Sequence, residues 1–196
     1  HPQWLTALQD AGFVAKAESP LSNRLVVATR KDQLPDMRNL NTLSHAGRIG
    51  IGSEGTPAGM YARQALATVG LTETIVPKLH QHSNVRAVLA HLEAGSTDAA
   101  FIYQTDVGIA PNIEARFVVE PALHDAIQLS FVLTHLGASN PEAVRLFDKL
   151  CAQSMVDRFL NRGFTENEVP TPVLSHTSPN PITMPSKPIR LSLWVG

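Results

Sequence analysis

The segment from residue 48 to residue 106 constrains the fold more than any other part of this chain. It reads as three consecutive pieces, RIGIGSEGTPAGMYARQAL, KLHQHSNVRAVLAHLEAG and DAAFIYQTD. In each of the first two pieces, a strand ends in small or polar residues and turns directly into a helix. The third piece is a strand with Tyr103 at its far end. Alternating strands and helices predict βαβ units, and therefore an α/β fold with a parallel sheet between helices.

The rest of the chain adds further elements on either side of this segment. Thr56-Pro57 and Asn140-Pro141 are typical helix starts, and Gly163 is a typical helix end. Periodicity predicts helices over 3–14, 57–70, 85–93 and 141–163, a short helix within 38–47, and strands over 23–30, 48–53, 75–82, 98–104, 114–121 and 126–134.

Composition argues against a nucleic-acid-binding protein and against a fold held by disulfides. Charged residues make up 17% of the chain, hydrophobic residues 43%, and the net charge is −1. The 16 Lys and Arg residues are scattered, whereas a nucleic-acid-binding protein would show a basic face, so we expect no nucleic-acid partner. Cys151 is the single cysteine, which rules out an internal disulfide, and it lies on an apolar helix stripe where a buried, inert thiol is expected.

Two motifs suggest a nucleotide site and a metal site, and in each case the surrounding residues argue against that site. Residues 50–55 spell G-x-G-x-x-G, but the helix start comes after the last glycine and the next strand ends without an acidic residue, which disfavours a dinucleotide site. His80, His82 and His91 suggest zinc, yet no carboxylate or cysteine stands near them to complete a tetrahedral set. We therefore expect no metal site. The sequence leaves open a hydrolase site made of Ser, His and Asp residues that only folding brings together.

The helix starts themselves predict an anion site. The first-turn amides of a helix have no internal partner, and the helix dipole places about half a positive charge there. In a parallel sheet both starts lie at the carboxyl edge of the strands, where Tyr103 also ends its strand. Every α/β protein has such helix starts, so the pattern alone does not decide whether they bind an anion. The residues in question are Thr56, Pro57, Ala58 and Gly59 at the first start and Ser83, Asn84 and Val85 at the second.

The same segments resemble one known family. RIGIGSEGTPAGMYARQALATVGL, SNVRAVLAHLEAG and FIYQTDV, with NRLVV before them and NPEAVRLFDKL and RGF after them, resemble the periplasmic molybdate-binding proteins of ABC transporters, colinearly from Trp4 to Phe164. The resemblance implies a two-lobed periplasmic-binding-protein fold of type II. It also implies a molybdate or tungstate oxyanion held by the amides of Ala58 and Val85 and by Tyr103, without a cofactor, a protein-bound metal or an inward carboxylate.

The chain also departs from this family at both ends. The family begins with a first-lobe segment whose serine loops donate further hydrogen bonds to the ligand, and this sequence does not contain that segment. At the other end, the tail continues through a proline-rich stretch into PIRLSLWVG, which resembles the opening of a permease. We therefore expect a complete second lobe and a partial first lobe. The expected divisions are 1–27 for the first-lobe remnant and first crossover, 28–126 for the second lobe, 127–164 for the return crossover strand and C-terminal helices, 165–188 for a linker and 189–196 for a permease start.

The resemblance implies a function without covalent chemistry. The expected protein is an extracytoplasmic, periplasmic solute-binding component of an ABC importer that delivers molybdate or tungstate to a membrane permease and, through it, to an ATPase. Its lobes would close around the ligand by a hinge at residues 23–30 and 127–134. Two alternatives come from other classes: a cytoplasmic oxyanion-sensing domain of a transcriptional regulator, and an enzyme acting on a phosphorylated substrate.

Overall fold

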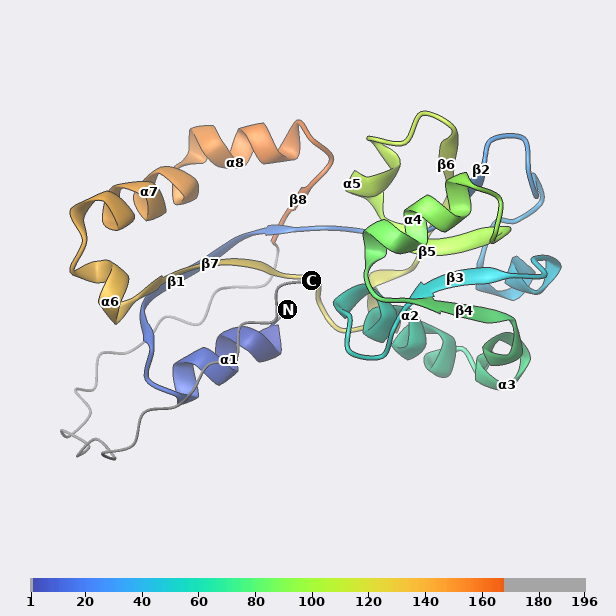
Figure 1. Ribbon diagram of the computed structural model, residues 1–196, viewed down its shortest axis with the longest axis horizontal. Helices are drawn as coiled ribbons and strands as arrows, with labels where there is room; N and C mark the ends of the chain where they lie inside the picture. The colour runs from blue at the N-terminus through green and yellow to red at the C-terminus, as the bar shows by residue number, and fades with distance from the viewer. Residues whose placement is uncertain (1, 168–196) are drawn as a thin grey trace.

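The computed structural model describes residues 2–167 of the chain and shows two lobes joined by two extended connections (Figure 1). The larger lobe is built on a five-stranded sheet and the smaller lobe on a three-stranded sheet. Within residues 2–167, no helix combines the length and the apolar character needed to cross a membrane.

The larger lobe comprises residues 25–123. Its elements are β2 (Leu25–Arg30), the 3-10 helix η1 (Leu40–His45), β3 (Ile49–Gly52), α2 (Pro57–Thr68), α3 (Thr72–Ile75), η2 (Val76–Lys78), β4 (Leu79–His82), α4 (Val85–Glu93), β5 (Ala99–Tyr103), α5 (Gln104–Val107), β6 (Ile113–Val118) and η3 (Pro121–Leu123).

The sheet of the larger lobe is mixed, with the strand order β4-β3-β5-β2-β6. β3 pairs in parallel with β4 and β5, whereas β2 pairs antiparallel with both β5 and β6. Four strands therefore run in one direction and β2 runs against them. The predicted α/β architecture is confirmed, but the sheet is mixed, because β2, the strand that enters from the smaller lobe, runs against the other four.

Alternating side chains divide the larger lobe into two cores. Leu25 and Val27 of β2 lie in one buried cluster with residues of α2, while Val26 and Ala28 lie in a second cluster with residues of α4. Successive strand residues point to opposite faces, so an uninterrupted apolar strand indicates a sheet covered on both sides. Figure 1 shows α2 and α4 on opposite sides of the sheet.

The smaller lobe is assembled from both ends of the described chain. β1 pairs antiparallel with β7 and, at its far end, with the two-residue strand β8. Its elements are α1 (Pro2–Asp10), β1 (Val14–Ser22), β7 (Leu129–Thr134), α6 (His135–Ala138), α7 (Pro141–Cys151), α8 (Gln153–Leu160) and β8 (Thr165–Glu166).

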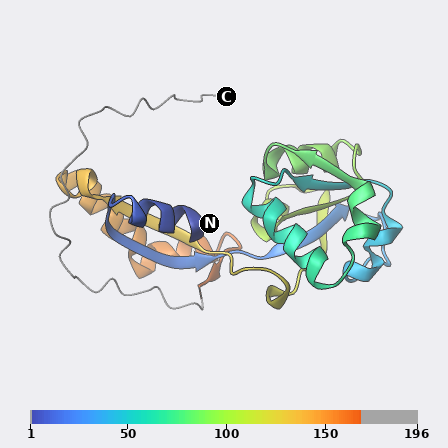
Figure 2. The ribbon, with the colours of Figure 1, turned by 90° about the horizontal axis from the view of Figure 1, so that it is seen from below.

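The two connections between the lobes are plainly separated in Figure 2. The first consists of Asn23 and Arg24, which join β1 to β2. The second runs from residue 119 to residue 128 and includes η3, which packs on α2 and so belongs to the larger lobe as well. The strand at 23–30, expected to cross between the lobes, instead lies almost wholly in the larger sheet. The expected division at residue 28 accordingly differs from the observed start of β2 at Leu25.

Other expectations need correction. β1 was not predicted. The strand expected over 75–82 is shortened to β4, because Ile75 ends α3 and Pro77 lies in η2. The helix expected over 141–163 breaks at Ala152, whose ψ of 141° is extended. Thr165 and Glu166, expected to open the linker, pair with β1. The rest of the expected linker, from residue 168, and the expected permease start at 189–196 lie outside the described residues.

Candidate anion-binding site

The first helix start of the site is the junction between β3 and α2. The Thr56 hydroxyl accepts a hydrogen bond from the Gly59 N–H at 3.3 Å and donates one to the Ser53 carbonyl at 2.8 Å. Pro57 occupies the first helical turn, where its missing N–H removes no helix bond. Ala58 follows in the same turn and is buried. Within residues 2–167, no protein acceptor takes the Ala58 N–H.

The glycine at position 59 is required by close packing. A Cβ atom on Gly59 would lie 2.2 Å from the Gly52 carbonyl oxygen and 2.5 Å from the Ser53 carbonyl oxygen. Any side chain would therefore push the first turn of α2 away from the end of β3. The Pro-Ala-Gly sequence thus sets how deeply the helix start is seated on the sheet.

The second helix start is that of α4. Asn84 has an extended backbone with φ of −161°, and its side-chain oxygen accepts from the Ala87 N–H at 2.9 Å. The Asn84 amide group also donates to the Ser83 hydroxyl at 3.2 Å. Val85 is the first helical residue, and no acceptor within the described part of the chain takes its N–H.

Tyr103 ends β5 and begins a reversal of the chain. Its backbone N–H donates to Asp106 Oδ2 at 3.1 Å, which closes the short turn that follows the strand. Burial is the main cause that raises the pKa of the Tyr103 phenol above its ordinary value, with smaller contributions from Tyr61 and Asp106. The phenol therefore stays protonated around neutral pH and keeps a proton to donate.

One cavity of about 290 Å³ collects these features. Pro57, Val85 and Tyr103 line it, and Ala58 lies next to Pro57 in the first turn of α2. Thr56 and Asn84 cap the two helices, Gly59 packs on the end of β3, and Ser83 accepts from the Asn84 side chain; none of the four lines the cavity. The full lining is Asn23, Pro57, Tyr61, Val85, Arg86, Tyr103, Thr105, Asp106, Ile127, Gln128, Leu129 and Phe164.

Several polar lining residues escape sequence reasoning. Asn23 is 9% exposed and donates from Nδ2 to the Thr105 hydroxyl at 2.9 Å, so the first connection between the lobes is tied to the turn after β5. Tyr61 of α2 is also buried, and burial, followed by Asp125, raises its pKa to about 12. The proximity of Asn23 and Thr105, which are far apart in the chain, had no local sequence signal. Tyr61 could have been found from its place one helical turn after Pro57.

The cavity contains a carboxylate, which contradicts the expectation of a site without one. Asp106 is 3% exposed, and its Oδ2 accepts from the Tyr103 N–H while its Oδ1 lies 3.5 Å from Arg86 Nη1. Burial raises the pKa of the Asp106 carboxyl, against the lowering effects of these two partners. Both oxygens thus face donors of the protein, which reduces the repulsion that a bound anion meets.

A larger cavity of about 510 Å³ lies beside the connections between the lobes. Residues of both connections and of β8 line it, among them Asn23, Arg24, His124, Ile127 and Glu166. No first-turn residue of α2 or α4 is among its lining residues. We therefore place the candidate anion site in the smaller cavity, where two helix starts and a phenol converge.

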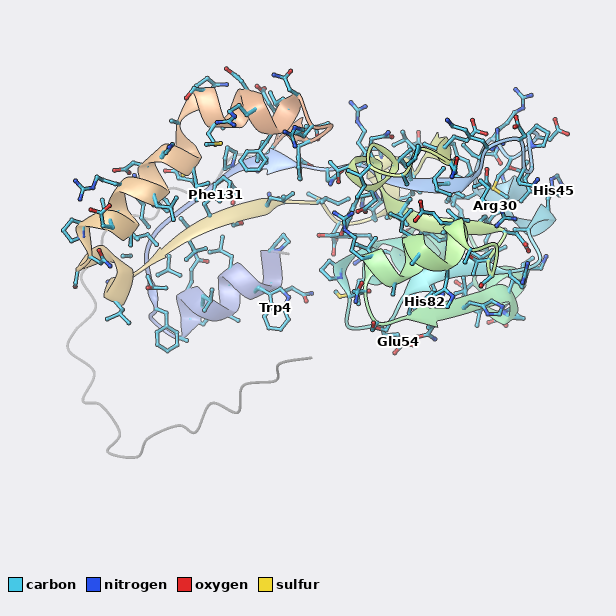
Figure 3. All side chains as sticks on the ribbon, turned by 45° about the horizontal axis from the view of Figure 1, so that its top comes forward. Trp4, Arg30, His45, Glu54, His82 and Phe131 are labelled. Carbon is cyan, nitrogen blue, oxygen red and sulfur yellow. The ribbon has the colours of Figure 1, made fainter. Side chains whose placement is uncertain are left out.

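The residues considered for other chemistry lie elsewhere on the larger lobe. His82 ends β4, and its ring stacks on that of His91 with centroids 4.1 Å apart. Burial, followed by His91 and His80, lowers the pKa of His82. In the span from residue 2 to residue 167, no three His, Cys, Asp or Glu residues gather as a metal site would require. Figure 3 shows Glu54 and His82 on the larger lobe and Trp4 and Phe131 on the smaller lobe.

Comparisons with known proteins agree with this architecture. A curated relative, the molybdate-binding protein ModA of Escherichia coli, is 27% identical over 158 residues, which cover 77% of this chain and 61% of the relative. The chain thus spans less than two thirds of that relative's length. A second relative, from Bacillus subtilis, is 25% identical over 161 residues and is covered to a similar extent, 62%.

Solved structures show the same fold. The periplasmic molybdate-binding protein of Azotobacter vinelandii matches with a TM-score of 0.72 at 16% identity, covering 87% of this chain and 76% of that one. The sulfate-binding protein SubI of Mycobacterium tuberculosis matches with a TM-score of 0.67 at 13% identity, covering 85% and 66%. The family described as bacterial extracellular solute-binding protein matches residues 1–165. The chain therefore belongs to the family of bacterial extracellular solute-binding proteins.

Proposed function

We propose that this chain carries the ligand-binding lobe of an extracytoplasmic solute-binding protein that captures molybdate or tungstate for an ABC importer. The observation that supports it most is the convergence of the α2 start, the α4 start and Tyr103 on one cavity. The amides of Ala58 and Val85 and the phenol of Tyr103 are the proposed donors. The permease and its ATPase are the proposed partners, and the periplasm the proposed location.

The chemistry of the cavity suits a tetrahedral dianion. Molybdate and tungstate are fully deprotonated near neutral pH, so they accept hydrogen bonds and donate none. Helix-start amides and a phenol supply donors, and they act at the positive end of two helix dipoles. Arg86 and the Tyr103 N–H face the Asp106 carboxylate, so that group offers little to a protonated oxyanion such as hydrogen phosphate.

The described residues supply donors from one side of the ligand. The smaller lobe, built on β1, β7 and β8, lies at the other end of the two connections (Figure 1), and the resemblance places further hydroxyl donors on the first lobe of the family. We propose that the complete protein closes its two lobes around the ligand, with movement at Asn23 and Arg24 and in residues 119–128. No covalent step is required, so no enzymatic activity is proposed.

The direct test is calorimetric titration of the full-length protein with molybdate, tungstate, sulfate and phosphate at neutral pH. The expected result is tight binding of molybdate and tungstate and much weaker binding of phosphate. Saturable binding of phosphate at least as tight as that of molybdate, or no binding of either metal oxyanion, would contradict the proposal.

A further inference from the structure

Arg63 joins the two parts of the junction that presents the Ala58 amide. It lies on α2, and its Nη1 donates to the Gly52 carbonyl at 2.9 Å and to the Gly59 carbonyl at 3.1 Å. Gly52 is the last residue of β3, and Gly59 lies in the first turn of α2. One guanidinium nitrogen therefore ties the strand end to the helix start across the loop of residues 53–56.

Because the packing at this junction is tight, the hydrogen bonds of Arg63 affect the position of the first turn of α2. The α2 start touches the strand end so closely that Gly59 has no room for a Cβ atom. The Gly59 carbonyl shares its peptide group with the Met60 N–H, two residues beyond the Ala58 N–H and in the same first turn of α2, so a shift of that carbonyl displaces the turn that carries the Ala58 amide. Arg63 thus helps to determine where the Ala58 N–H points.

The charge of Arg63 lacks a protein counter-charge. Among residues 2–167, no carboxylate forms an ion pair with it, and its Nη2 is buried without a hydrogen-bond partner. Glu54, in the adjacent loop, is exposed. A partly buried cation without a counter-charge is costly. A dianion bound at the first turn of α2 offsets part of that cost.

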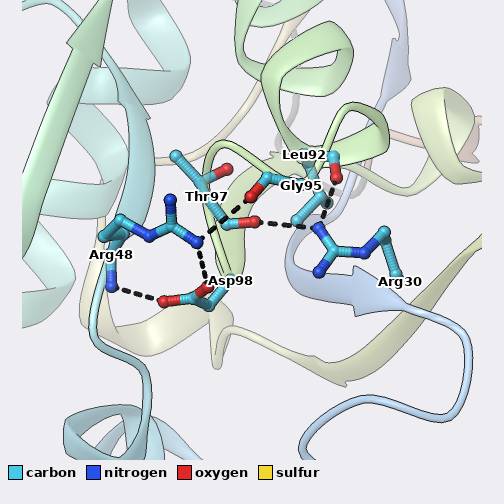
Figure 4. A network of polar contacts seen from close by, with 6 residues as sticks. All are labelled: Arg30, Arg48, Leu92, Gly95, Thr97 and Asp98. Carbon is cyan, nitrogen blue, oxygen red and sulfur yellow. Dashed lines mark hydrogen bonds and ion pairs between the residues drawn. The ribbon is translucent and has the colours of Figure 1, made fainter.

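A second arginine offers a matched comparison at the other end of the sheet. Arg30 Nη1 also donates to two backbone carbonyls, those of Leu92 at 3.0 Å and Thr97 at 3.2 Å (Figure 4). Arg30 is likewise partly buried and forms no ion pair with a carboxylate in the described part of the chain. It braces the C-terminal end of α4, away from both helix starts.

We propose that Arg63 is a positioning residue of the oxyanion site, which holds the α2 start in place and supplies a fixed positive charge behind it that favours dianions. This inference rests on the proposed function. It assigns to a residue outside the cavity lining a share of the affinity for doubly charged ligands.

The experiment measures molybdate affinity calorimetrically in the full-length protein and in three variants, Arg63→Gln, Arg63→Lys and the matched control Arg30→Gln. Thermal unfolding without ligand first establishes that each variant folds. We expect Arg63→Gln to weaken molybdate binding about tenfold, because loss of the fixed charge should cost about as much as loss of one charge-assisted hydrogen bond. Arg63→Lys should restore most of the affinity, and Arg30→Gln should bind as the unaltered protein does.

Salt dependence separates the charge from simple bracing. The Debye length falls from about 30 Å at 0.01 M salt to about 3 Å at 1 M. If the charge acts on the ligand, the affinity ratio between the unaltered protein and Arg63→Gln shrinks over this range; a purely structural role leaves the ratio constant. Should Arg63→Gln not fold, Arg63→Lys carries the test, with near-normal affinity expected.

The outcomes are distinguishable. Failure of the unaltered protein to bind molybdate overturns the proposed function. Normal binding by the unaltered protein together with unchanged affinity in Arg63→Gln, a salt-independent ratio, or a loss in Arg63→Lys as large as that in Arg63→Gln overturns this inference and leaves the proposed function standing. An equal loss in Arg30→Gln also overturns it, because the effect would then belong to any bracing arginine.

Discussion

The turn formed by residues 103–106 holds the Tyr103 hydroxyl in position to donate a hydrogen bond to a ligand. The Asp106 carboxylate accepts the backbone N–H of Tyr103 and so holds the turn, while burial raises the pKa of the Tyr103 phenol further above neutral. The side chain ends a strand whose other residues are fully buried, which limits its movement. A hydroxyl held in this way loses little entropy when it donates to a ligand.

The first prediction concerns this hydroxyl. Tyr103→Phe in the full-length protein should weaken molybdate binding by about 1 to 3 kcal/mol, the usual loss for a charge-assisted hydrogen bond. Calorimetry measures the change, and the unfolding midpoint without ligand serves as the control for folding. Unchanged affinity in a folded variant removes Tyr103 from the site.

The second prediction concerns the buried carboxyl of Asp106. Its pKa is raised above the ordinary value of 3.8, mainly by burial. Between 3.8 and the raised value, the folded state holds a proton that the unfolded state has released, so this group's contribution to stability falls as pH rises through that window. Asp106→Asn keeps an acceptor for the Tyr103 N–H but does not titrate.

The measurement is the free energy of unfolding of both proteins by urea across a series of pH values above 3.8. The stability of the unaltered protein relative to Asp106→Asn should decline as pH rises. A difference that stays constant with pH, or that changes in the opposite direction, refutes the assignment.

At the scale of the elements, two helix caps hold the site. The Thr56 and Asn84 side chains each accept an N–H of the first turn that they precede. These caps leave the Ala58 and Val85 amides free of protein acceptors within the described residues. The sequence signals for both starts, Thr-Pro and Ser-Asn, are local, which is why the helix starts could be predicted without knowledge of the fold.

The third prediction tests the second cap. Asn84→Ala should lower the free energy of unfolding by about 1 kcal/mol, the usual cost of losing a capping side chain. Molybdate affinity should fall as well, since the first turn of α4 frays more readily. Asn84→Ser, which retains a capping oxygen, is the matched control and should stay near the unaltered protein in both denaturation and calorimetry. Equal behaviour of Ala and Ser at this position would exclude capping as the role of Asn84.

Elements that depend on distant partners were harder to predict. β1 contains Pro20 and charged residues, so its sequence lacks a strand pattern, and pairing with β7 over a long chain separation makes it a strand. β4 is short because α3 and η2 take residues 72–78, which leaves only residues 79–82 to pair with β3. The break at Ala152 carries neither glycine nor proline, so the apolar period on both sides of it predicts one helix where two exist.

On the scale of the whole molecule, the cavity lies where the larger lobe meets the connections. Asn23 and Ile127, one from each connection, line the cavity together with the residues of the helix starts. Local signals therefore identified the helix starts and Tyr103, whereas Asn23, Thr105 and Gln128 join the cavity only through the crossing of the chain. The approach of Asp106 to the cavity was missed for a similar reason, since its turn folds back toward Arg86.

The fourth prediction concerns the 196-residue chain by itself. Its described donors come from one side of the cavity, and the chain covers 61% of a molybdate-binding relative. We expect it to bind molybdate weakly or not measurably, and the full-length protein to bind it tightly. Parallel titrations of the two proteins give the comparison. Equal, tight affinity would show that residues of this chain supply all the donors that matter, and would contradict the proposal that further first-lobe donors complete the site.

The reversed strand β2 has a mechanical consequence. It is hydrogen-bonded on both edges, to β5 and β6, and its side chains are buried on both faces. A pull on Arg24 from the smaller lobe is therefore shared with the strands on both sides of β2, instead of peeling away an outer strand. The larger lobe resists such a load as one block, and bending is left to the two connections outside the sheet.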